Sequence, residues 1–276
     1  MKSSIAVFLS GSAIPVSKHG MLSSQSGAGA VEPNISDEGL KAYYKFNEES
    51  GNILNSSESD DSLGSSAELV VTGATYNQSD SPTNIGYSML FDGSNDYAKV
   101  SSSLDDFKFT WDVGTWSIAF WLKVDTFATN DVVFDTGNHA DSLNVGALIN
   151  LNGTSKMAFS IANGAGDPWV TYNVSDADYV PDTDWNFYCI TYDQSLGSNN
   201  CKFYLNNSLH SQHNIDGGGT PSSNDADTPL NVARNPDPTG QYYDGYMTEV
   251  SWWDKILSTD DMETLYNSGN GLAIYG

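Results

Sequence analysis

Residues 116–125 read WSIAFWLKVD, and apolar and polar residues alternate along this stretch with a period of two. Successive side chains of a β-strand point to opposite faces. One face of the stretch would therefore carry Trp116, Ile118, Phe120, Leu122 and Val124, and the other Ser117, Lys123 and Asp125. This pattern predicts a strand that buries one face in a core.

Similar short stretches recur along the chain. LKAYYKF places Leu40, Ala42, Tyr44 and Phe46 on one face, and further examples are VGALIN, KMAFSIA, PWVTYNV, NFYCITYD, CKFYLNN, PLNVAR and GYMTEVSWW. Turn-rich segments such as NGAGDP and DGGGTPSSNDADTP separate them. One helix is expected at Ser258–Ser268, with Ser258 as N-cap, Asp261 three residues on and Gly269 after the end. Many short strands with one C-terminal helix predict an all-β sandwich of antiparallel sheets.

The composition excludes two classes of partner. The 276 residues include 35 acidic and 11 basic ones, for a formal net charge of −24. Such a surface repels the phosphate backbone, so no nucleic-acid partner is expected. No apolar run approaches the length needed to cross a bilayer, so no membrane span is expected.

Residues 1–38 differ in composition from the rest and are predicted to form an extended N-terminal arm before a domain at 39–276. One interpretation is an anchor, in which Ile5, Val7, Phe8 and Leu9 bind a protein partner such as a capsid or tail protein. The other is a leader and linker, because Lys2 precedes IAVFL and Ala28-Gly29-Ala30 resembles a cleavage site. The apolar run breaks at Ser10-Gly11-Ser12, which favours the anchor.

Five phrases in order resemble the laminin-G-like branch of the concanavalin A-like lectin/glucanase superfamily. They are GLKAYYKFNEESGN, YSMLFDGSNDYAKV, WSIAFWLKV, WNFYCITYDQSLGSNNCKFYLNN and YDGYMTEVSWWDKILSTDDMETLYNSG, which together span about residues 39–272. The resemblance implies a jelly roll of two antiparallel sheets, one of them concave. It does not imply one function, because lectins, adhesion modules, glycosidases and structural domains share this fold.

The carboxylate pattern argues against an enzyme. Glycoside hydrolysis needs two carboxyl groups that face one bond. The closely spaced pairs Asp176/Asp178, Asp182/Asp184 and Asp225/Asp227 lie in expected loops. Glu249 is the one glutamate on a strongly predicted strand, and positions 247 and 251 are Met and Ser. No catalytic residue is therefore assigned, and glycoside hydrolase remains the third functional reading.

A structural calcium ion is one reading of the turn in YSMLFDGSNDYAKV. Asp92 and Asp96 flank a tight turn in which Gly93 is free to adopt a positive φ, and carboxylates with backbone carbonyls are the ligands calcium prefers. The family resemblance implies a third ligand from the near-C-terminal strand, where Glu249 stands and Thr248 replaces an acidic residue. The other reading is that the Asp side chains merely close the turn.

Sugar binding would use exposed aromatic rings beside polar groups. The candidates are Trp169 and Tyr172 after the NGAGDP loop, and Tyr242 and Tyr243 before Asp244. The sequence thus predicts a non-catalytic jelly-roll protein displayed on a large assembly, with a virion surface favoured, that serves as decoration or binds glycans. The alternative is a secreted or cell-surface carbohydrate-binding module.

Overall fold

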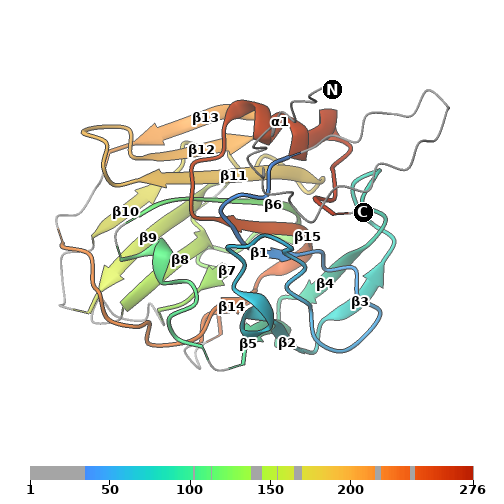
Figure 1. Cartoon of the computed structure of the whole chain (residues 1–276). Coiled ribbons are helices and arrows are strands. Elements are labelled where there is room, and N and C mark those ends of the chain that lie inside the picture. The colour runs from blue at the N-terminus through green and yellow to red at the C-terminus, as the bar shows by residue number, and fades with distance from the viewer. Residues whose placement is uncertain are drawn as a thin grey trace, which may run out of the picture. The chain divides into compact units, whose positions relative to one another are not determined.

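The computed structural model describes residues 35–275 apart from 102, 113, 138–144, 154, 165–169, 215–218 and 237–239. The chain divides after Pro33, and the structure below is that of the unit from Asn34 to Gly276. Two antiparallel sheets pack face to face in a jelly-roll sandwich with one short α-helix (Figure 1). The predicted all-β fold is confirmed.

The first sheet, called sheet A, has the strand order β13-β12-β11-β6-β15-β4-β3, and β1 pairs with β15 beside β4. Its strands are β1 (Leu40–Tyr44), β3 (Thr75–Gln78), β4 (Ser88–Asp92), β6 (Thr115–Thr126), β11 (Asn186–Asp193), β12 (Cys201–Leu205), β13 (Ser208–His213) and β15 (Asp244–Trp253).

The second sheet, called sheet B, has the order β10-β9-β8-β7-β14-β5-β2. Its strands are β2 (Leu69–Thr72), β5 (Tyr97–Val100), β7 (Val132–Asp135), β8 (Val145–Leu151), β9 (Met157–Asn163), β10 (Thr171–Val174) and β14 (Asn231–Val232). Short 3-10 helices lie at η1 (Gly64–Ala67), η2 (Lys108–Thr110) and η3 (Asn267–Gly269).

The main core lies between the sheets. The predicted face of WSIAFWLKVD points into it, since Trp116, Ile118, Phe120, Leu122 and Val124 are all buried there. Aromatic rings from both sheets meet in this core, with Trp252 of β15 against Phe134 of β7 at 5.4 Å between ring centroids. Burial of these rings supplies much of the apolar area that stabilises the sandwich.

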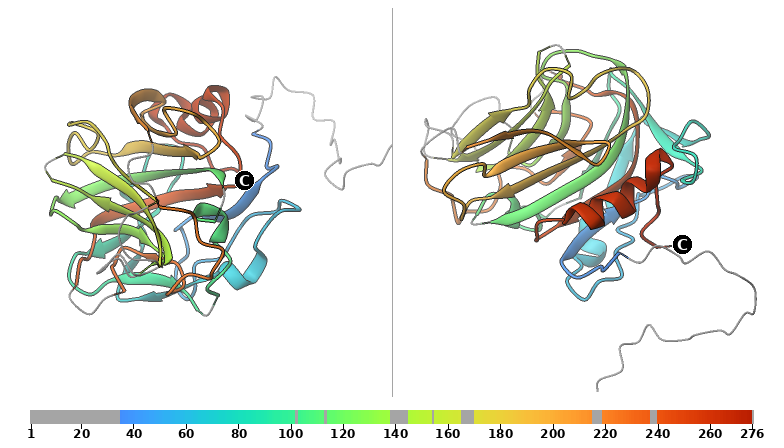
Figure 2. Two further views of the ribbon diagram at one scale, coloured as in Figure 1. Left: turned by 90° about the vertical axis from the view of Figure 1, so that its left-hand side faces the viewer. Right: turned by 90° about the horizontal axis from the view of Figure 1, so that it is seen from above.

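A second apolar cluster lies on the outer face of sheet A, beneath α1 (Thr259–Tyr266) (Figure 2). Met262 and Leu265 of α1 are buried, and the rings of Trp121 and Tyr266 stack at 5.9 Å with 14° between their planes. β6 is therefore apolar on both faces at its middle. Leu40 joins this second cluster instead of the main core, because a register shift between Leu40 and Ala42 reverses its direction.

The helix begins as predicted. Ser258 caps it, and its side chain and that of Asp261 accept from each other's backbone N–H groups in a capping box. The helix ends earlier than expected, because Asn267 adopts the left-handed conformation with φ 47°. The helix α1 has eight residues. No helix in the described part of the chain is long and apolar enough to cross a membrane.

The two cysteines are free and do not face each other. Cys189 pairs with Tyr204 and Cys201 with Tyr192 across β11 and β12. Cys189 belongs to the outer cluster and Cys201 to the main core, so their side chains lie on opposite faces of sheet A.

Residues 35–38 pack on the sandwich, although the sequence placed them in the arm. Ile35 is buried in the outer cluster, and the Asp37 carboxylate accepts a hydrogen bond from the Tyr275 hydroxyl at 2.9 Å. The anchor residues Ile5, Val7, Phe8 and Leu9 lie outside the described residues. Residues 35–38 therefore belong to the sandwich, which begins before Gly39.

A chain that begins at Asn34 should be more stable than one that begins at Gly39. Loss of the buried Ile35 side chain and the Asp37 hydrogen bond should cost about 1–3 kcal/mol, which corresponds to a decrease in Tm of about 3–8 °C for a unit of this size. Thermal unfolding of the two chains checks this, with Ile35→Ala in the longer chain as the matched variant. Equal Tm values would show that residues 35–38 contribute nothing to the fold.

Candidate functional site

The candidate site is the face of sheet B that points away from sheet A, called the open face below. Cross-strand pairing places one row of residues across it: Tyr172, Ser160, Leu148, Asp135, Asn231, Lys99 and Val70, in order from β10 to β2. Ser160, Asp135 and Asn231 of this row are buried, and its two ends, Tyr172 and Val70, are exposed. The strand neighbours of these residues, such as Phe159 and Ile149, point into the main core. The alternation that builds the core thus also places polar side chains on the opposite face.

The ring of Tyr172 lies across the open face. Its hydroxyl accepts a hydrogen bond at 2.8 Å from Nδ2 of Asn152, the residue that follows β8. Because Tyr172 belongs to β10 and β9 separates β10 from β8, the ring must cross β9 at the small residue Ala158, which is fully buried. The residue is 38% exposed, so part of its side chain is accessible to solvent while its hydroxyl is held.

Two buried polar atoms lie beside this ring. Ser160 stands opposite Tyr172, and Asn150 stands opposite Ala158, so both belong to the open face. Ser160 Oγ and Asn150 Oδ1 have no hydrogen-bond partner among the described residues. A buried polar group without a partner costs about 1–3 kcal/mol. No described protein group therefore forms a hydrogen bond with either of these two atoms.

Two cations lie at the other end of the row. The Arg234 guanidinium carbon is 3.5 Å from the centroid of the Tyr97 ring, and Arg234 Nε donates to Asn231 Oδ1 at 3.0 Å. Lys99 stands opposite Asn231. A hydrogen bond with Thr72 and the charges of Arg234 and Lys99 lower the pKa of the Tyr97 hydroxyl. The open face is therefore aromatic and neutral at β10 and cationic at β5.

The predicted sugar-binding residues are not brought together. Trp169 lies outside the described residues. Tyr242 is half-buried and bridges Val132 and Arg234, so it lies four strand spacings from Tyr172, about 19 Å away at the usual strand spacing. The prediction for Tyr243 was wrong. Its side chain is fully buried in the main core and its hydroxyl donates to the Lys123 carbonyl at 2.9 Å, because it faces inward where Tyr242 does not.

The predicted calcium ligands are also separated. Asp92 pairs with Asp244 at the start of β15, and Glu249 lies five residues further along that strand, about 16 Å away. Gly93 does adopt a positive φ of 68°. The turn uses its carboxylates itself: Asp96 accepts from Asp92 N at 3.1 Å, and Asp92 accepts from Ser94 N at 2.9 Å. In the described ranges no three His, Cys, Asp or Glu side chains form a group that could hold a metal ion.

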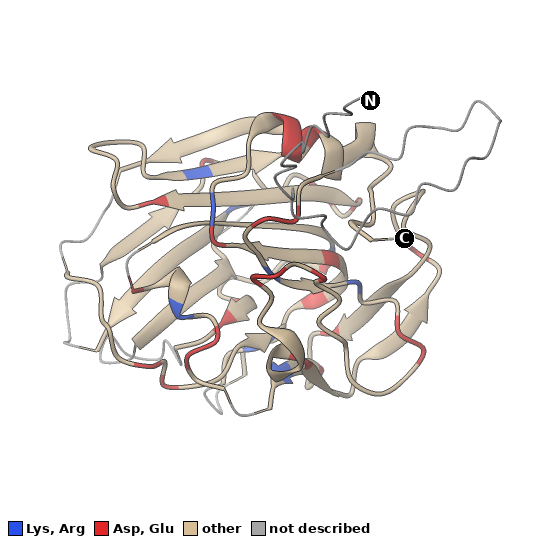
Figure 3. Cartoon of the chain, viewed as in Figure 1, with Lys and Arg blue, Asp and Glu red and all other residues tan. Residues whose placement is uncertain are grey.

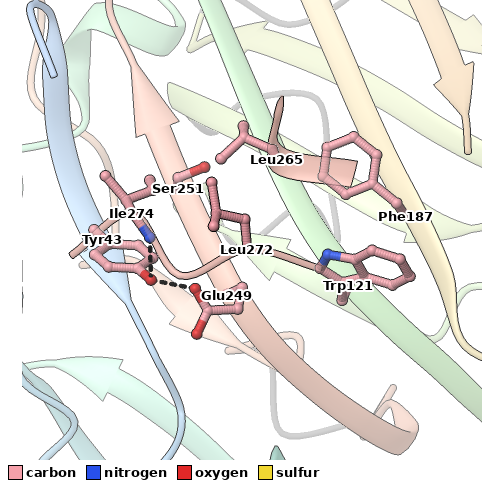
Figure 4. A pocket seen from close by; sticks show the side chains of 8 residues that line it. All are labelled: Tyr43, Trp121, Phe187, Glu249, Ser251, Leu265, Leu272 and Ile274. Carbon is pink, nitrogen blue, oxygen red and sulfur yellow. Dashed lines mark hydrogen bonds between the residues drawn. The ribbon is translucent and has the colours of Figure 1, made fainter. Parts of the chain in front are cut away.

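Glu249 occupies a closed pocket between sheet A and the C-terminal segment. Figure 4 shows its carboxylate pointing at the hydroxyl of Tyr43, which donates to Glu249 and accepts from the backbone N–H of Ile274 at 3.0 Å. Trp121, Phe187, Ser251, Leu265 and Leu272 complete the lining. Burial raises the pKa of Glu249 to about 8. The carboxyl group thus joins β1, β15 and the C-terminal segment and is not accessible to a polysaccharide.

A β-bulge delivers Glu249 to this pocket. The pairing of β15 with β6 shifts by one residue between Thr248 and Ser251, and Glu249 adopts φ 52°. An extra residue of this kind reverses the alternation locally. Period-two reasoning from the sequence could not locate it.

Sequence reasoning also missed Asn150, Ser160, Lys99 and Tyr97. Each lies on a stretch that was expected to be a strand or its flank, at the position opposite the apolar face. A partial signal was present: the residues that alternate with the core positions are Gly, Leu and Asn in VGALIN, and Ala, Ser and Ala in KMAFSIA. The acidic residues of the described ranges, in contrast, lie largely in loops and turns (Figure 3).

Solved structures share this architecture. The binding domain of botulinum neurotoxin serotype D is similar with a TM-score of 0.57 and 13% identity, over 84% of this chain and 52% of that domain. The binding domain of botulinum neurotoxin DC in complex with SialylT gives 0.57 and 15%, over the same shares of the two chains. The chain thus spans about half of these domains. A search of curated protein sequences found no match.

A family model matches more than half of the chain. The model is described as the concanavalin A-like lectin/glucanases superfamily, of laminin-G type, and it covers residues 92–262. The matched range runs from the Asp92 turn to the middle of α1 and includes β6, β11 and β15, the central strands of sheet A. The chain belongs to the concanavalin A-like lectin/glucanase superfamily.

Proposed function

We propose that the protein is a non-catalytic glycan-binding module whose sugar lies on the open face of sheet B. The observation that carries the proposal is Tyr172, which is 38% exposed on this face and whose hydroxyl is held by Asn152. Sugar rings stack their C–H faces on such aromatic surfaces, and neighbouring polar groups orient their hydroxyls. Asn152, which holds the Tyr172 hydroxyl, supplies a group of this kind.

The structural neighbours support a binding role. They are binding domains of a toxin, and the structures include a serotype D domain in complex with N-acetylneuraminic acid, which is similar to this chain with a TM-score of 0.55 and 13% identity. At this identity the similarity concerns the fold alone. The binding role of this chain therefore rests on its own open face.

The absence of hydrolase activity is part of the proposal. Glu249 is the glutamate that the sequence placed on a strong strand, and it is buried against Tyr43. A general acid has to reach the glycosidic oxygen, and a second carboxyl group has to face the same bond. Glu249 is enclosed on the other sheet from the open face, so it does not serve a sugar bound there.

The location that we predict for the protein rests on the sequence alone. Display on a virion or another large assembly through Ile5, Val7, Phe8 and Leu9 remains our prediction, with an extracellular module as the alternative. A structural calcium ion likewise remains a prediction, and the separation of Asp92 from Glu249 limits it to the turn at Asp92 and Asp96.

Replacement of Tyr172 tests the proposed function. Tyr172→Ala should weaken binding to the glycan that the wild-type protein selects on an array by at least about tenfold, because it removes the stacking surface. Asn152→Ala should give a smaller loss, since the ring stays but its hydroxyl is no longer held. Titration calorimetry with the selected glycan measures both.

Tyr87→Ala is the matched control, because Tyr87 is also exposed, at 46%, and precedes β4 of sheet A. Its replacement should leave the affinity unchanged. If Tyr172→Ala binds as the wild type does, the open face is not the glycan site.

A further inference from the structure

Arg234 is unusual in this chain. It is the one arginine in a sequence with 35 acidic residues, yet among the described residues no carboxylate lies within 4.0 Å of its guanidinium group or of the Lys99 ammonium group. Its guanidinium is held by the Tyr97 ring and by Asn231. Its Nε–H group donates to Asn231, and its side chain also forms a hydrogen bond with the Tyr97 hydroxyl, so that these contacts orient the guanidinium plane. A guanidinium group has five N–H donors, and these contacts with described residues do not use all of them.

A backbone irregularity brings Arg234 to the open face. Val232 points into the main core, so simple alternation would turn Ala233 outward and Arg234 inward. Ala233 instead adopts φ 64° and is also buried in the core. This conformation costs a residue other than glycine about 1–3 kcal/mol. Because of this conformation, the Arg234 side chain lies with those of Asn231 and Tyr97 on the open face of sheet B.

Lys99 adds a second positive charge at the same place. It is two residues from Tyr97 on β5, so both side chains point to the open face, and both cations act on the Tyr97 hydroxyl. Two cations held near one group repel each other, and an anion between them relieves that repulsion. In the same row the carboxylate is Asp135, which lies two strands from Lys99 and accepts from Gly137 N at 2.7 Å.

We propose that Arg234, together with Lys99 and Tyr97, binds the carboxylate of an acidic sugar, so that the glycan on the open face is an acidic one. The proposal rests on the proposed function and specifies its ligand. Planar guanidinium groups match carboxylates through paired hydrogen bonds, and the fixed plane of Arg234 favours this geometry. Lys99 lies five strands from Tyr172, about 24 Å, so an oligosaccharide is required to reach both ends of the row.

The test compares three oligosaccharides of equal length: an oligogalacturonate, the corresponding neutral galacto-oligosaccharide and a sulfated one. The wild-type protein should bind the oligogalacturonate at least about tenfold more tightly than the neutral one. Arg234→Gln should abolish this preference, so that the variant binds the two oligosaccharides with equal affinity. Arg234→Lys should keep only part of the preference, because lysine keeps the charge and loses the planar fork.

Lys202→Gln is the control for net charge, since Lys202 lies on β12 of sheet A and its loss changes the total charge by the same amount. It should retain the full preference. The proposal is overturned if Lys202→Gln and Arg234→Gln have equal effects, or if the wild type binds both ligands equally. Tighter binding of the sulfated ligand than of the oligogalacturonate overturns the assignment to a carboxylate.

The failure of this inference and that of the proposed function are distinguishable. If Tyr172→Ala weakens both ligands while Arg234→Gln leaves their ratio unchanged, the glycan site stands and the acidic ligand is wrong. If Arg234→Gln removes the preference while Tyr172→Ala has no effect on binding, Arg234 and Lys99 bind the acidic ligand and the proposed role of Tyr172 is wrong. If no oligosaccharide of either class binds, both proposals fail.

Discussion

Raising the pH from 5 to 9 should lower the free energy of unfolding by several kcal/mol through one side chain, Glu249. Its carboxyl group is buried beneath the C-terminal segment, and burial raises its pKa from 4.5 to about 8. In the unfolded chain the same group ionises near pH 4.5. The folded state therefore holds a proton that the unfolded state releases between these two values.

The sign follows from this difference. Below pH 4.5 the group is protonated in both states, and its contribution to stability is fully present. As the pH rises towards 8 the unfolded state is favoured by ionisation, and the loss reaches about 4–5 kcal/mol once the pH exceeds the folded pKa. Burial also raises the pKa of Asp131 to about 6. Ionisation of Asp131 therefore also lowers the free energy of unfolding as the pH rises, by a smaller amount.

Glu249→Gln should remove most of this dependence. Glutamine stays neutral at all pH values, and its Oε1 remains able to accept the hydrogen bond from Tyr43. The variant should match the wild type within about 1 kcal/mol at pH 5 and exceed it by several kcal/mol at pH 9. Urea unfolding at a series of pH values measures this, with Glu49→Gln as control because Glu49 is exposed. Parallel pH profiles for the wild type and Glu249→Gln would show that Glu249 is ionised in the folded protein.

Gly245→Ala should cost about 3–5 kcal/mol of unfolding free energy. Gly245 lies in β15 with φ +146°, between β6 and β4. A Cβ atom there would lie 2.2 Å from the Lys123 carbonyl oxygen and 2.8 Å from the Tyr243 hydroxyl. That hydroxyl donates to Lys123 O, so the methyl group would separate two central strands and disturb the hydrogen bond that links them.

Gly51→Ala separates this clash from the cost of the backbone conformation. Gly51 also has a positive φ, of +86°, but a Cβ atom added there meets no atom within 4 Å. Its replacement should cost only about 1 kcal/mol. Chemical unfolding of both variants gives the comparison. Equal losses would mean that the packing of β15 on β6 tolerates a methyl group at residue 245.

Much of the fold was predictable because its signals are local. The alternation in WSIAFWLKVD identifies both the strand and its core face, and these follow from the geometry of an extended chain alone. The start of the helix at Ser258 was equally predictable, since a capping box needs only residues three positions apart. The five phrases that resemble the family are also local stretches of sequence, and three of them contain β6, β11 and β15.

The candidate site was predicted only in part. Tyr172 was expected to be exposed, and it is, because it occupies an outward position on the edge strand β10. Tyr242 and Tyr243 are adjacent in the sequence, and the sequence does not show which of them points inward. The partners of Tyr172, Asn150 and Ser160, lie on other strands, and only the pairing of β8, β9 and β10 identifies them.

The sequence by itself determined the all-β class, the main core face of β6, the capped start of α1 and the acidic character of the surface. The tertiary structure alone decided where alternation fails: at Leu40, at Ala233 and at Glu249, where register shifts or positive φ angles reverse the direction of the side chains. These reversals depend on what each strand pairs with and packs against, so no local pattern reports them. They bury Glu249 and turn Arg234 outward. The raised pKa of Glu249 and the ligand that we propose for Arg234 both depend on that placement.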